Sequence, residues 1–415
     1  MSHRIFFKVT IVALLYLGVN VLFFFGWDVN SLTSVLESIL PAAFLLTTCF
    51  IYRLLTLKIG WLKHHKRTEL ELLALILILT VVQKTTGKTA FFSTIINCLL
   101  IPVLVSALVP VVIDKGKVIV KNLTEALSFR NLILVFYVVE CVWAVFERLF
   151  TLNIFPFSQI GDERVTEALT TEEFRSSALI NHPLQNALCV SIIMSFILIT
   201  SIKVKYKYAL WALGFLAILC FNTRSSIAGW IVLFAVFTYH SQIYNKKISV
   251  REKSYIIRFT VFAAIGVLVL MFSVNWGQRL LEMGLFDDSS SQARIDVLGL
   301  FANQNLSDLL LGISQADINK RVYMLDLITI ENFWLIYLFK YGIIFTVLLV
   351  ILFSKLFKRI LNGYQPFQKF FVLTCFIGIS STNNSLAVPS PALAIFILCC
   401  YSFNPLLIKL IKNDS

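Results

Sequence analysis

Apolar runs of about 20 residues recur along the whole chain, and they limit what it can fold into. Hydrophobic residues occupy 58% of the 415 positions, whereas charged residues occupy only 14%. A soluble protein of this length needs more charge to cover its surface. Because the runs are apolar throughout and do not alternate with polar residues, they indicate membrane helices and not a transmembrane β-barrel. The sequence therefore predicts an all-α, polytopic membrane protein whose residues 1–415 form one domain.

Hydropathy predicts about twelve transmembrane helices. Most connections between them are short, but two loops are long. The helices are expected to start near residues 5, 32, 69, 89, 130, 180, 207, 225, 256, 331, 367 and 391. One long loop covers residues 151–179, and a larger one covers residues 277–330. Loops of this length are uncommon without a function of their own. The larger loop is expected to contain a short amphipathic helix, with Ile295, Leu298 and Ala302 on one face.

The positions of the lysines and arginines explain the net charge of +13. Most of the 36 basic residues fall in alternate connections, together with both termini. By the positive-inside rule, these connections and the N- and C-termini are cytoplasmic, and both long loops are extracytoplasmic. The basic charge is thus a topology signal, and nucleic acid is not implied. We expect a multi-pass protein of the bacterial cytoplasmic (inner) membrane, with the lipid bilayer as its solvent.

Arg224 lies between two apolar runs, in the stretch "FNTRSSIAGW". The rise from Lys207 to Arg224 is about 26 Å at 1.5 Å per residue, close to the ~30 Å hydrocarbon core. Arg224 is therefore predicted at an outer turn between two helices. In the middle of the membrane it would cost at least ~2.5 kcal/mol.

Other charged and polar residues allow two interpretations each. Arg175 is suited to bidentate capture of phosphate, whereas His182, taken alone, is typical of an interfacial residue. Glu331 either stabilises a helix N-terminus or serves as a general base at an outer cavity. Glu140 and Lys340 fall near mid-membrane, where we hypothesise an ion pair; separate charges are the alternative. The sequence contains no Walker motif, no GxGxxG and no DxD pair, so a metal or cofactor has no support.

Four stretches in order resemble the O-antigen polymerase and O-antigen ligase superfamily. They are "RSSALINHPLQNA", "NTRSSIAGW", the segment from Arg294 to Leu311-Gly312, and "ENFWLIYLFKYGII". The first is similar to the family's Arg before an Asn/His-Pro helix start, and the second to its Ser/Thr-Arg-Ser/Gly/Ala turn. Glu331 stands where ligases usually place His, which favours a polymerase. The resemblance covers roughly residues 160–360.

The resemblance implies a metal-independent membrane glycosyltransferase. Its donor would be a polyprenyl-pyrophosphate-linked oligosaccharide, polymerised into O-antigen or capsule on the outer face, with a chain-length regulator and a flippase as protein partners. The candidate catalytic residues are Arg224, Glu331 and Arg294, and the candidate substrate-binding residues are Arg175, His182, Asn332 and Arg321. Three alternatives stay open: an O-antigen ligase that transfers glycan to another carrier, a flippase or other transporter, and a scaffold without catalysis.

Overall fold

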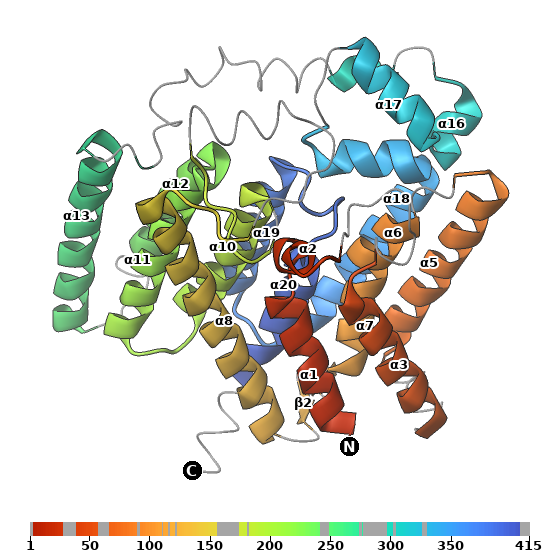
Figure 1. Cartoon of the computed structure of the whole chain (residues 1–415). Coiled ribbons are helices and arrows are strands. Elements are labelled where there is room, and N and C mark those ends of the chain that lie inside the picture. The colour runs from red at the N-terminus through yellow and green to blue at the C-terminus, as the bar shows by residue number, and fades with distance from the viewer. Residues whose placement is uncertain are drawn as a thin grey trace.

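Helices form nearly all of the described part of the chain in this computed structural model (Figure 1). The described residues are 3–27, 39–56, 66–88, 92–109, 111–114, 117–120, 123–155, 174–180, 182–240, 249–273, 276, 297–301, 304–325 and 330–406. Most helices run in one general direction, so the bundle has two ends. We call the end at the top of Figure 1, which carries α16 (Leu306–Leu311) and α17 (Gln315–Met324), the upper end. The lower end is the one at which the chain starts.

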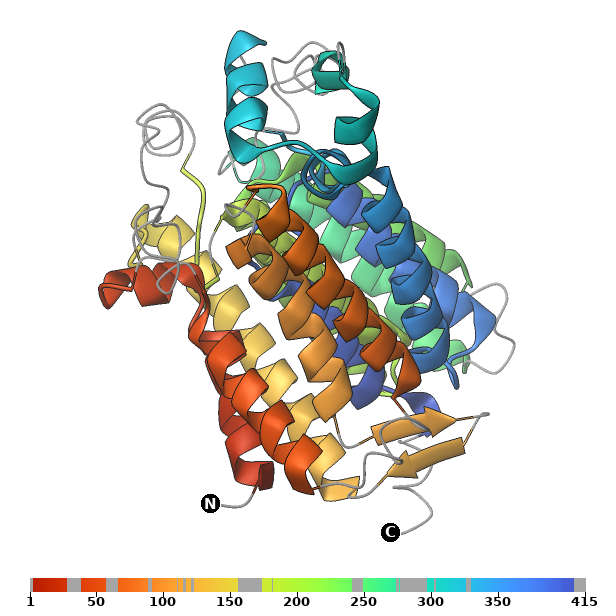
Figure 2. The ribbon, with the colours of Figure 1, turned by 90° about the vertical axis from the view of Figure 1, so that its right-hand side faces the viewer.

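The expectation of an all-α fold is confirmed, with one small hairpin in addition. The remaining helices are α1 His3–Tyr16, α2 Val19–Phe24, α3 Pro41–Thr56, α5 Arg67–Thr85, α6 Phe92–Thr94, the π-helical η2 Ile95–Leu100, α7 Ile101–Leu108, α8 Leu123–Phe150, α10 Pro183–Ile199, α11 Val204–Phe221, α12 Arg224–Tyr239, α13 Val250–Ser273, the 3-10 helix η4 Val297–Phe301, α18 Phe333–Ile360, α19 Pro366–Ser381 and α20 Ala392–Ser402. Strands β1 (Val111–Asp114) and β2 (Lys117–Val120) pair antiparallel, with Val111 opposite Val120. Figure 2 shows this hairpin at the lower end.

Three of the described helices are long and apolar enough to cross a membrane. They are Val204–Phe221, Val250–Phe272 and Phe333–Ile360. Six further helices are apolar but shorter: Ile5–Tyr16, Pro41–Leu55, Phe92–Leu108, Pro183–Ile199, Arg224–Tyr239 and Ala392–Ser402. The structure therefore supports a membrane protein built from several apolar helices.

Helix α10 lies at the centre of the bundle. All of its residues except Leu184 and Ile199 are buried, and α8, α11, α12, α19 and α20 pack around it. Its polar side chains are consequently held within protein; for example, Trp230 Nε1 of α12 donates to Ser191 Oγ at 2.8 Å. A helix that is apolar on every side fits this central position.

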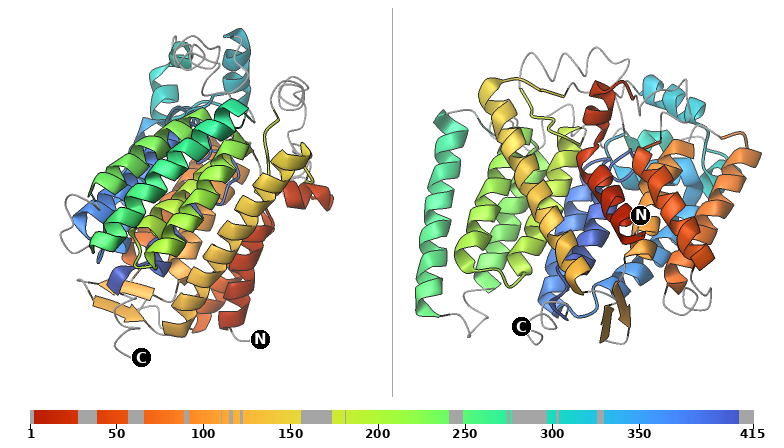
Figure 3. Two further views of the ribbon diagram at one scale, coloured as in Figure 1. Left: turned by 90° about the vertical axis from the view of Figure 1, so that its left-hand side faces the viewer. Right: turned by 60° about the horizontal axis from the view of Figure 1, so that its bottom comes forward.

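Helix α13, by contrast, stands at the edge of the bundle (Figure 3, right). It packs on α11 through the buried Ile256 and through the Phe259 ring, whose centroid lies 6.0 Å from that of Trp211. The opposite face is apolar and open, with Phe262 72% and Phe272 68% exposed. Such a surface is suited to lipid and not to water.

Helix α18 is broken. The sequence had predicted one straight helix for the tenth span, so this break was not expected. Gly342 has φ +73° inside the helix, so residues 333–341 lie across the upper end while the rest descends through the bundle (Figure 1). Gly342 and Gly312 (φ +84°) let two backbones touch: Ile313 N–H donates to the Phe339 carbonyl at 2.7 Å. A Cβ on Gly342 would lie 2.2 Å from the Leu310 carbonyl oxygen. The glycines are therefore needed for this close approach.

The hypothesised ion pair between Glu140 and Lys340 is not formed. Lys340 lies at the break in α18 and donates to Thr94 Oγ1 at 3.3 Å. Glu140 accepts a hydrogen bond from the backbone N–H of Leu179 at 3.4 Å. The idealised straight helix misplaced Lys340, because the break changes the direction of the chain two residues after it.

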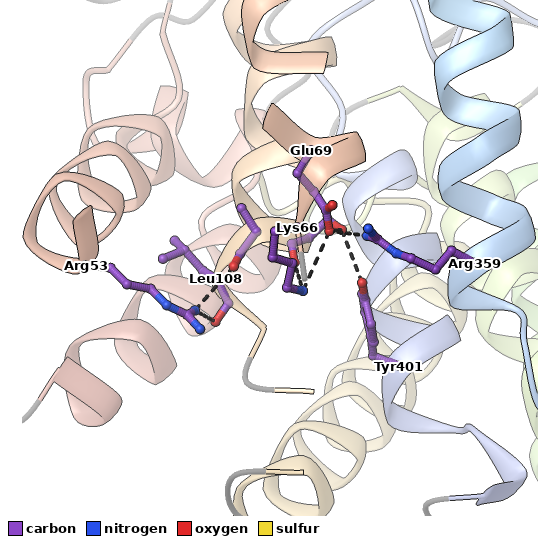
Figure 4. Close-up of polar contacts among 8 residues, drawn as sticks. Arg53, Lys66, Glu69, Leu108, Arg359 and Tyr401 are labelled. Atoms are coloured by element: carbon purple, nitrogen blue, oxygen red, sulfur yellow. Dashed lines mark hydrogen bonds and ion pairs between the residues drawn. The ribbon is translucent and has the colours of Figure 1, made fainter. Parts of the chain in front are cut away.

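A buried network of charged and polar groups joins four helices at the lower end (Figure 4). Glu69 Oε1 accepts from Ser106 Oγ at 2.9 Å, lies 3.6 Å from Lys66 Nζ and forms an ion pair with Arg359. Lys66 Nζ also donates to the Ser106 carbonyl at 2.7 Å and lies 5.1 Å from the centre of the Tyr401 ring. Burial lowers the pKa of Lys66 to about 8, although Glu69 opposes the shift. The network ties α5, α7, α18 and α20 together, and the single carboxylate of Glu69 faces the two cations Lys66 and Arg359.

The two predicted loops lie largely outside the described residues. Residues 156–173 of the first are not described, and neither are 277–296 of the second, which include Arg294. The described part of the second loop contains η4, α16 and α17 at the upper end. Of the expected amphipathic helix, only Leu298 falls within described structure, in η4.

Candidate functional site at the upper end

A non-helical segment of seven residues, 174–180, threads into the upper end of the bundle. We call it the strap. Its backbone is bound by side chains of α8: Ser177 N–H and Ala178 N–H each donate to Glu147 Oε2 at 2.9 Å. On the other side, the Ser177 carbonyl accepts from Asn186 Nδ2 of α10. Buried backbone groups need such partners, so these contacts explain how a non-helical segment can lie inside the bundle.

The strap brings Arg175 to the turn between α11 and α12. Arg175 Nε donates to the Phe221 carbonyl at 3.2 Å, and the neighbouring Ser176 N–H donates to the Cys220 carbonyl at 3.2 Å. Arg224, the first residue of α12, follows Phe221 by three residues and is half-buried. Two residues that the sequence singled out separately, Arg175 and Arg224, therefore flank one turn.

A third arginine, Arg148, lies at the same place and was not among the predicted site residues. Its guanidinium donates to the Phe174 carbonyl at the start of the strap. The sequence carried a signal for this face of α8. Glu140 and Glu147 are seven residues apart in an apolar helix, a spacing that puts both on one side.

The turn itself presents buried polar atoms beside the arginines. Asn222 ends α11 in the left-handed conformation at φ +51°, and Thr223 precedes α12 without a side-chain cap. Asn222, Thr223 and Ser226 are each at most 1% exposed. Within the described part of the chain, Asn222 Oδ1, Thr223 Oγ1 and Ser226 Oγ have no hydrogen-bond partner. Buried polar atoms of this kind call for an explanation, and a ligand is one.

The N-termini of α10 and α12 add positive potential at this end, because both helices begin at the upper end and run downward. The first N–H groups of a helix lack intrahelical partners, and the helix dipole is positive there. With the three arginines, the arrangement is suited to an anion such as a phosphate or pyrophosphate.

His182 has a structural role that the sequence left open. It precedes α10, and its Nδ1 accepts from the Leu184 backbone N–H at 3.2 Å. The residue thus caps the helix that follows the strap. The contact gives His182 a capping role, and its interpretation as an interfacial or substrate-binding residue stays a prediction.

Glu331 and Asn332 lie where α18 starts, beside the end of α19. Asn332 Oδ1 caps α18 by accepting from Trp334 N–H at 2.9 Å, and Phe333 N–H donates to the Asn383 carbonyl at 3.1 Å. Glu331 itself is half-buried.

Helix α12 packs on α19, and a Cβ on Gly229 would lie 3.7 Å from Ile379 Cγ1. Along α12, Arg224 lies about five residues above Gly229. Along α19, Asn383 lies about four residues above Ile379, just beyond the end of the helix, so at 1.5 Å per residue the two reach a similar height. Arg224 and Glu331 therefore flank the same end of α19.

Arg321 and Arg294 stand apart from this description. Arg321 Nη1 of α17 donates to the Leu300 carbonyl at 2.7 Å and so connects α17 to η4. Arg294 is outside the described residues. The structure thus brings Arg175, Arg224 and Arg148 together and gives Arg321 a contact within the upper loop.

Comparison with known proteins yields no relative on which a function could be based. The chain matches no protein-family model, no curated protein and no solved structure. A functional conclusion therefore depends on the geometry of the upper end and on the sequence resemblance.

Proposed function

We propose that this protein is a polymerase of a bacterial surface polysaccharide, O-antigen or capsule. It would take glycan from a polyprenyl-pyrophosphate-linked repeat unit and transfer it to an acceptor repeat unit at the outer face of the cytoplasmic membrane. The observation that carries the proposal is the meeting of Arg148, Arg175 and Arg224 around the turn at the start of α12. Three guanidinium groups beside buried hydroxyls that have no hydrogen-bond partner among the described residues suit a pyrophosphate carried on a lipid.

The proposed topology has about twelve spans, with both termini cytoplasmic and the upper end outside. The basic connections of the sequence support this orientation. The strap, α16 and α17 would then face the outer surface, where a lipid-linked donor arrives with its glycan in water and its lipid in the bilayer.

In the proposed reaction, the acceptor hydroxyl oxygen bonds to the anomeric carbon of the donor sugar. The bond between that carbon and the pyrophosphate oxygen breaks, and the lipid pyrophosphate leaves with one more negative charge. The arginines and the N-terminus of α12 stabilise this charge, since they are fixed in place before the reaction. Glu331 accepts the hydroxyl proton or orients the hydroxyl. This division of roles needs no metal and no cofactor.

Purified protein in lipid nanodiscs, supplied with lipid-linked repeat units alone, tests the proposal. A polymerase produces a ladder of chain lengths. An O-antigen ligase gives no product until its second carrier is added, and absence of product under both conditions would refute transfer altogether. Arg148→Gln is the informative variant, because sequence alone gave no reason to choose it; we expect it to remove the ladder.

One observation favours a transporter as the second candidate. Helix α18 is broken at Gly342, beside the half-buried Lys340, and discontinuous helices with charged groups are typical of transport sites. A strain lacking the protein separates the two. Unpolymerised repeat units would accumulate on the outer leaflet if a polymerase is missing, and would be absent from it if a flippase is missing.

A further inference from the structure

Glu147 lies in a concave arrangement of backbone N–H groups formed by the strap. Its Oε2 accepts from both Ser177 N–H and Ala178 N–H at 2.9 Å, and its Oε1 accepts from Trp143 Nε1 at 3.2 Å. Ala178 has φ +43°, in the left-handed region. Successive N–H groups around such a residue form a nest that binds an anion. The carboxylate is 0% exposed, so these hydrogen bonds form away from water.

The nest is two residues from Arg175, so it controls where that arginine lies. Between them, Ser176 is fixed twice: its N–H donates to the Cys220 carbonyl at 3.2 Å, and its Oγ donates to the Ala144 carbonyl at 2.8 Å. Two residues of extended chain span only about 7 Å, which leaves little slack between the nest and the guanidinium. Arg175 reaches the Phe221 carbonyl from this position.

We propose that Glu147 is a positioning residue: its carboxylate fixes the strap and thereby holds Arg175 at the α11–α12 turn, ready for pyrophosphate. The inference rests on the proposed function only in naming pyrophosphate as the ligand of Arg175. That the Glu147 carboxylate fixes the strap does not depend on the proposed function, and it can be tested without substrate.

Glu140 provides a matched control on the same helix. It lies seven residues earlier, on the same face, and is also 0% exposed. Its Oε2 accepts a single, longer bond, from Leu179 N–H at 3.4 Å. Removing it should therefore disturb the strap far less than removing Glu147, although both changes delete a buried carboxylate.

The first measurement is amide hydrogen exchange of residues 174–180 in nanodiscs, read by mass spectrometry. In Glu147→Ala we expect the Ser177 and Ala178 amides to exchange at least tenfold faster than in the wild type. Glu140→Ala should leave them within about twofold. Unchanged exchange in Glu147→Ala overturns the inference. If Glu147→Ala fails to fold, Glu147→Gln takes its place, because it keeps an acceptor oxygen. Its Ser177 and Ala178 amides should exchange faster than those of the wild type, but less than tenfold faster.

The second measurement is binding of undecaprenyl pyrophosphate to the same nanodiscs. Glu147→Ala should weaken binding about tenfold and, in the polymerisation assay, raise KM for the donor with kcat within about threefold. If Arg175→Ala weakens binding but Glu147→Ala does not, the positioning role is wrong and the proposed function survives. If Arg175→Ala has no effect either, pyrophosphate is not the ligand of Arg175, and the proposed function fails at this residue.

Discussion

A methyl group added at Gly342 should separate the upper loop from α18. Gly342→Ala has a matched control in Gly87→Ala, because both glycines have φ +73°. A Cβ on Gly342 would lie 2.2 Å from the Leu310 carbonyl oxygen, whereas a Cβ on Gly87 would meet nothing within 4 Å. The two variants share the same positive φ, and only Gly342→Ala adds a collision with backbone.

The expected free energies follow from this difference. A positive φ costs an alanine roughly 1–2 kcal/mol, and at Gly342, whose ψ of 172° lies in a region that essentially only glycine adopts, the cost is roughly 1–3 kcal/mol. At Gly342 the two backbones must also move apart by about 1 Å, which breaks the hydrogen bond from Ile313 N–H to the Phe339 carbonyl. Losing a buried hydrogen bond adds about 1–3 kcal/mol. We therefore expect a total loss of roughly 2–6 kcal/mol for Gly342→Ala, against roughly 1–2 kcal/mol for Gly87→Ala.

Equilibrium unfolding in detergent micelles measures both losses. Limited proteolysis provides a local readout, because cleavage within residues 304–325 should become faster in Gly342→Ala and not in Gly87→Ala. Equal loss of stability in the two variants, with unchanged cleavage, would show that the close approach at Gly342 contributes nothing. The reasoning from backbone contact would then be refuted.

Three further predictions concern charged residues. Arg224→Lys keeps the charge but loses the guanidinium fork, so polymer formation should fall while membrane insertion, measured by fractionation, stays intact. Glu69→Ala leaves Lys66 buried without its carboxylate and should cost about 3–5 kcal/mol in micelle unfolding, whereas Glu71→Ala, which removes only an exposed ion pair, should stay within about 0.5 kcal/mol. The pKa of Lys66 is about 8 in the folded protein and 10.5 when unperturbed, so Lys66 stays protonated to a higher pH in the unfolded chain than in the folded protein. The free energy of unfolding should therefore rise between pH 8 and pH 10.5. In Lys66→Met this rise should be absent.

The sequence predicted best what the bilayer itself demands. The helices at 183–199, 204–221 and 224–239 follow apolar runs, and the distance from Lys207 sufficed to place Arg224 at a turn between two of them. These are local inferences, because a lipid solvent requires long apolar helices whatever their neighbours are.

The contacts of the candidate site depended on pairings that no local pattern encodes. Glu147 binds a residue 30 positions later in the chain, and no sequence motif marks Arg148. The break in α18 was missed because Gly342 lies within a mostly apolar run, where a glycine gives no sign of its φ. Only the packing of residues 306–313 on α18 makes that glycine necessary.

The enclosed position of α10 has a consequence for the order of biosynthesis. Trp230 of α12 can bind the Ser191 hydroxyl early, because α12 follows α10 closely in the chain. The Ser191 carbonyl, however, accepts from Cys375 Sγ of α19 at 3.5 Å. Helix α19 emerges from the ribosome about 170 residues after α10, or roughly 10–30 s later at 5–20 residues per second. During that interval one side of α10 faces lipid or the insertion machinery. A nascent chain halted before α19 should consequently remain a substrate for membrane quality control.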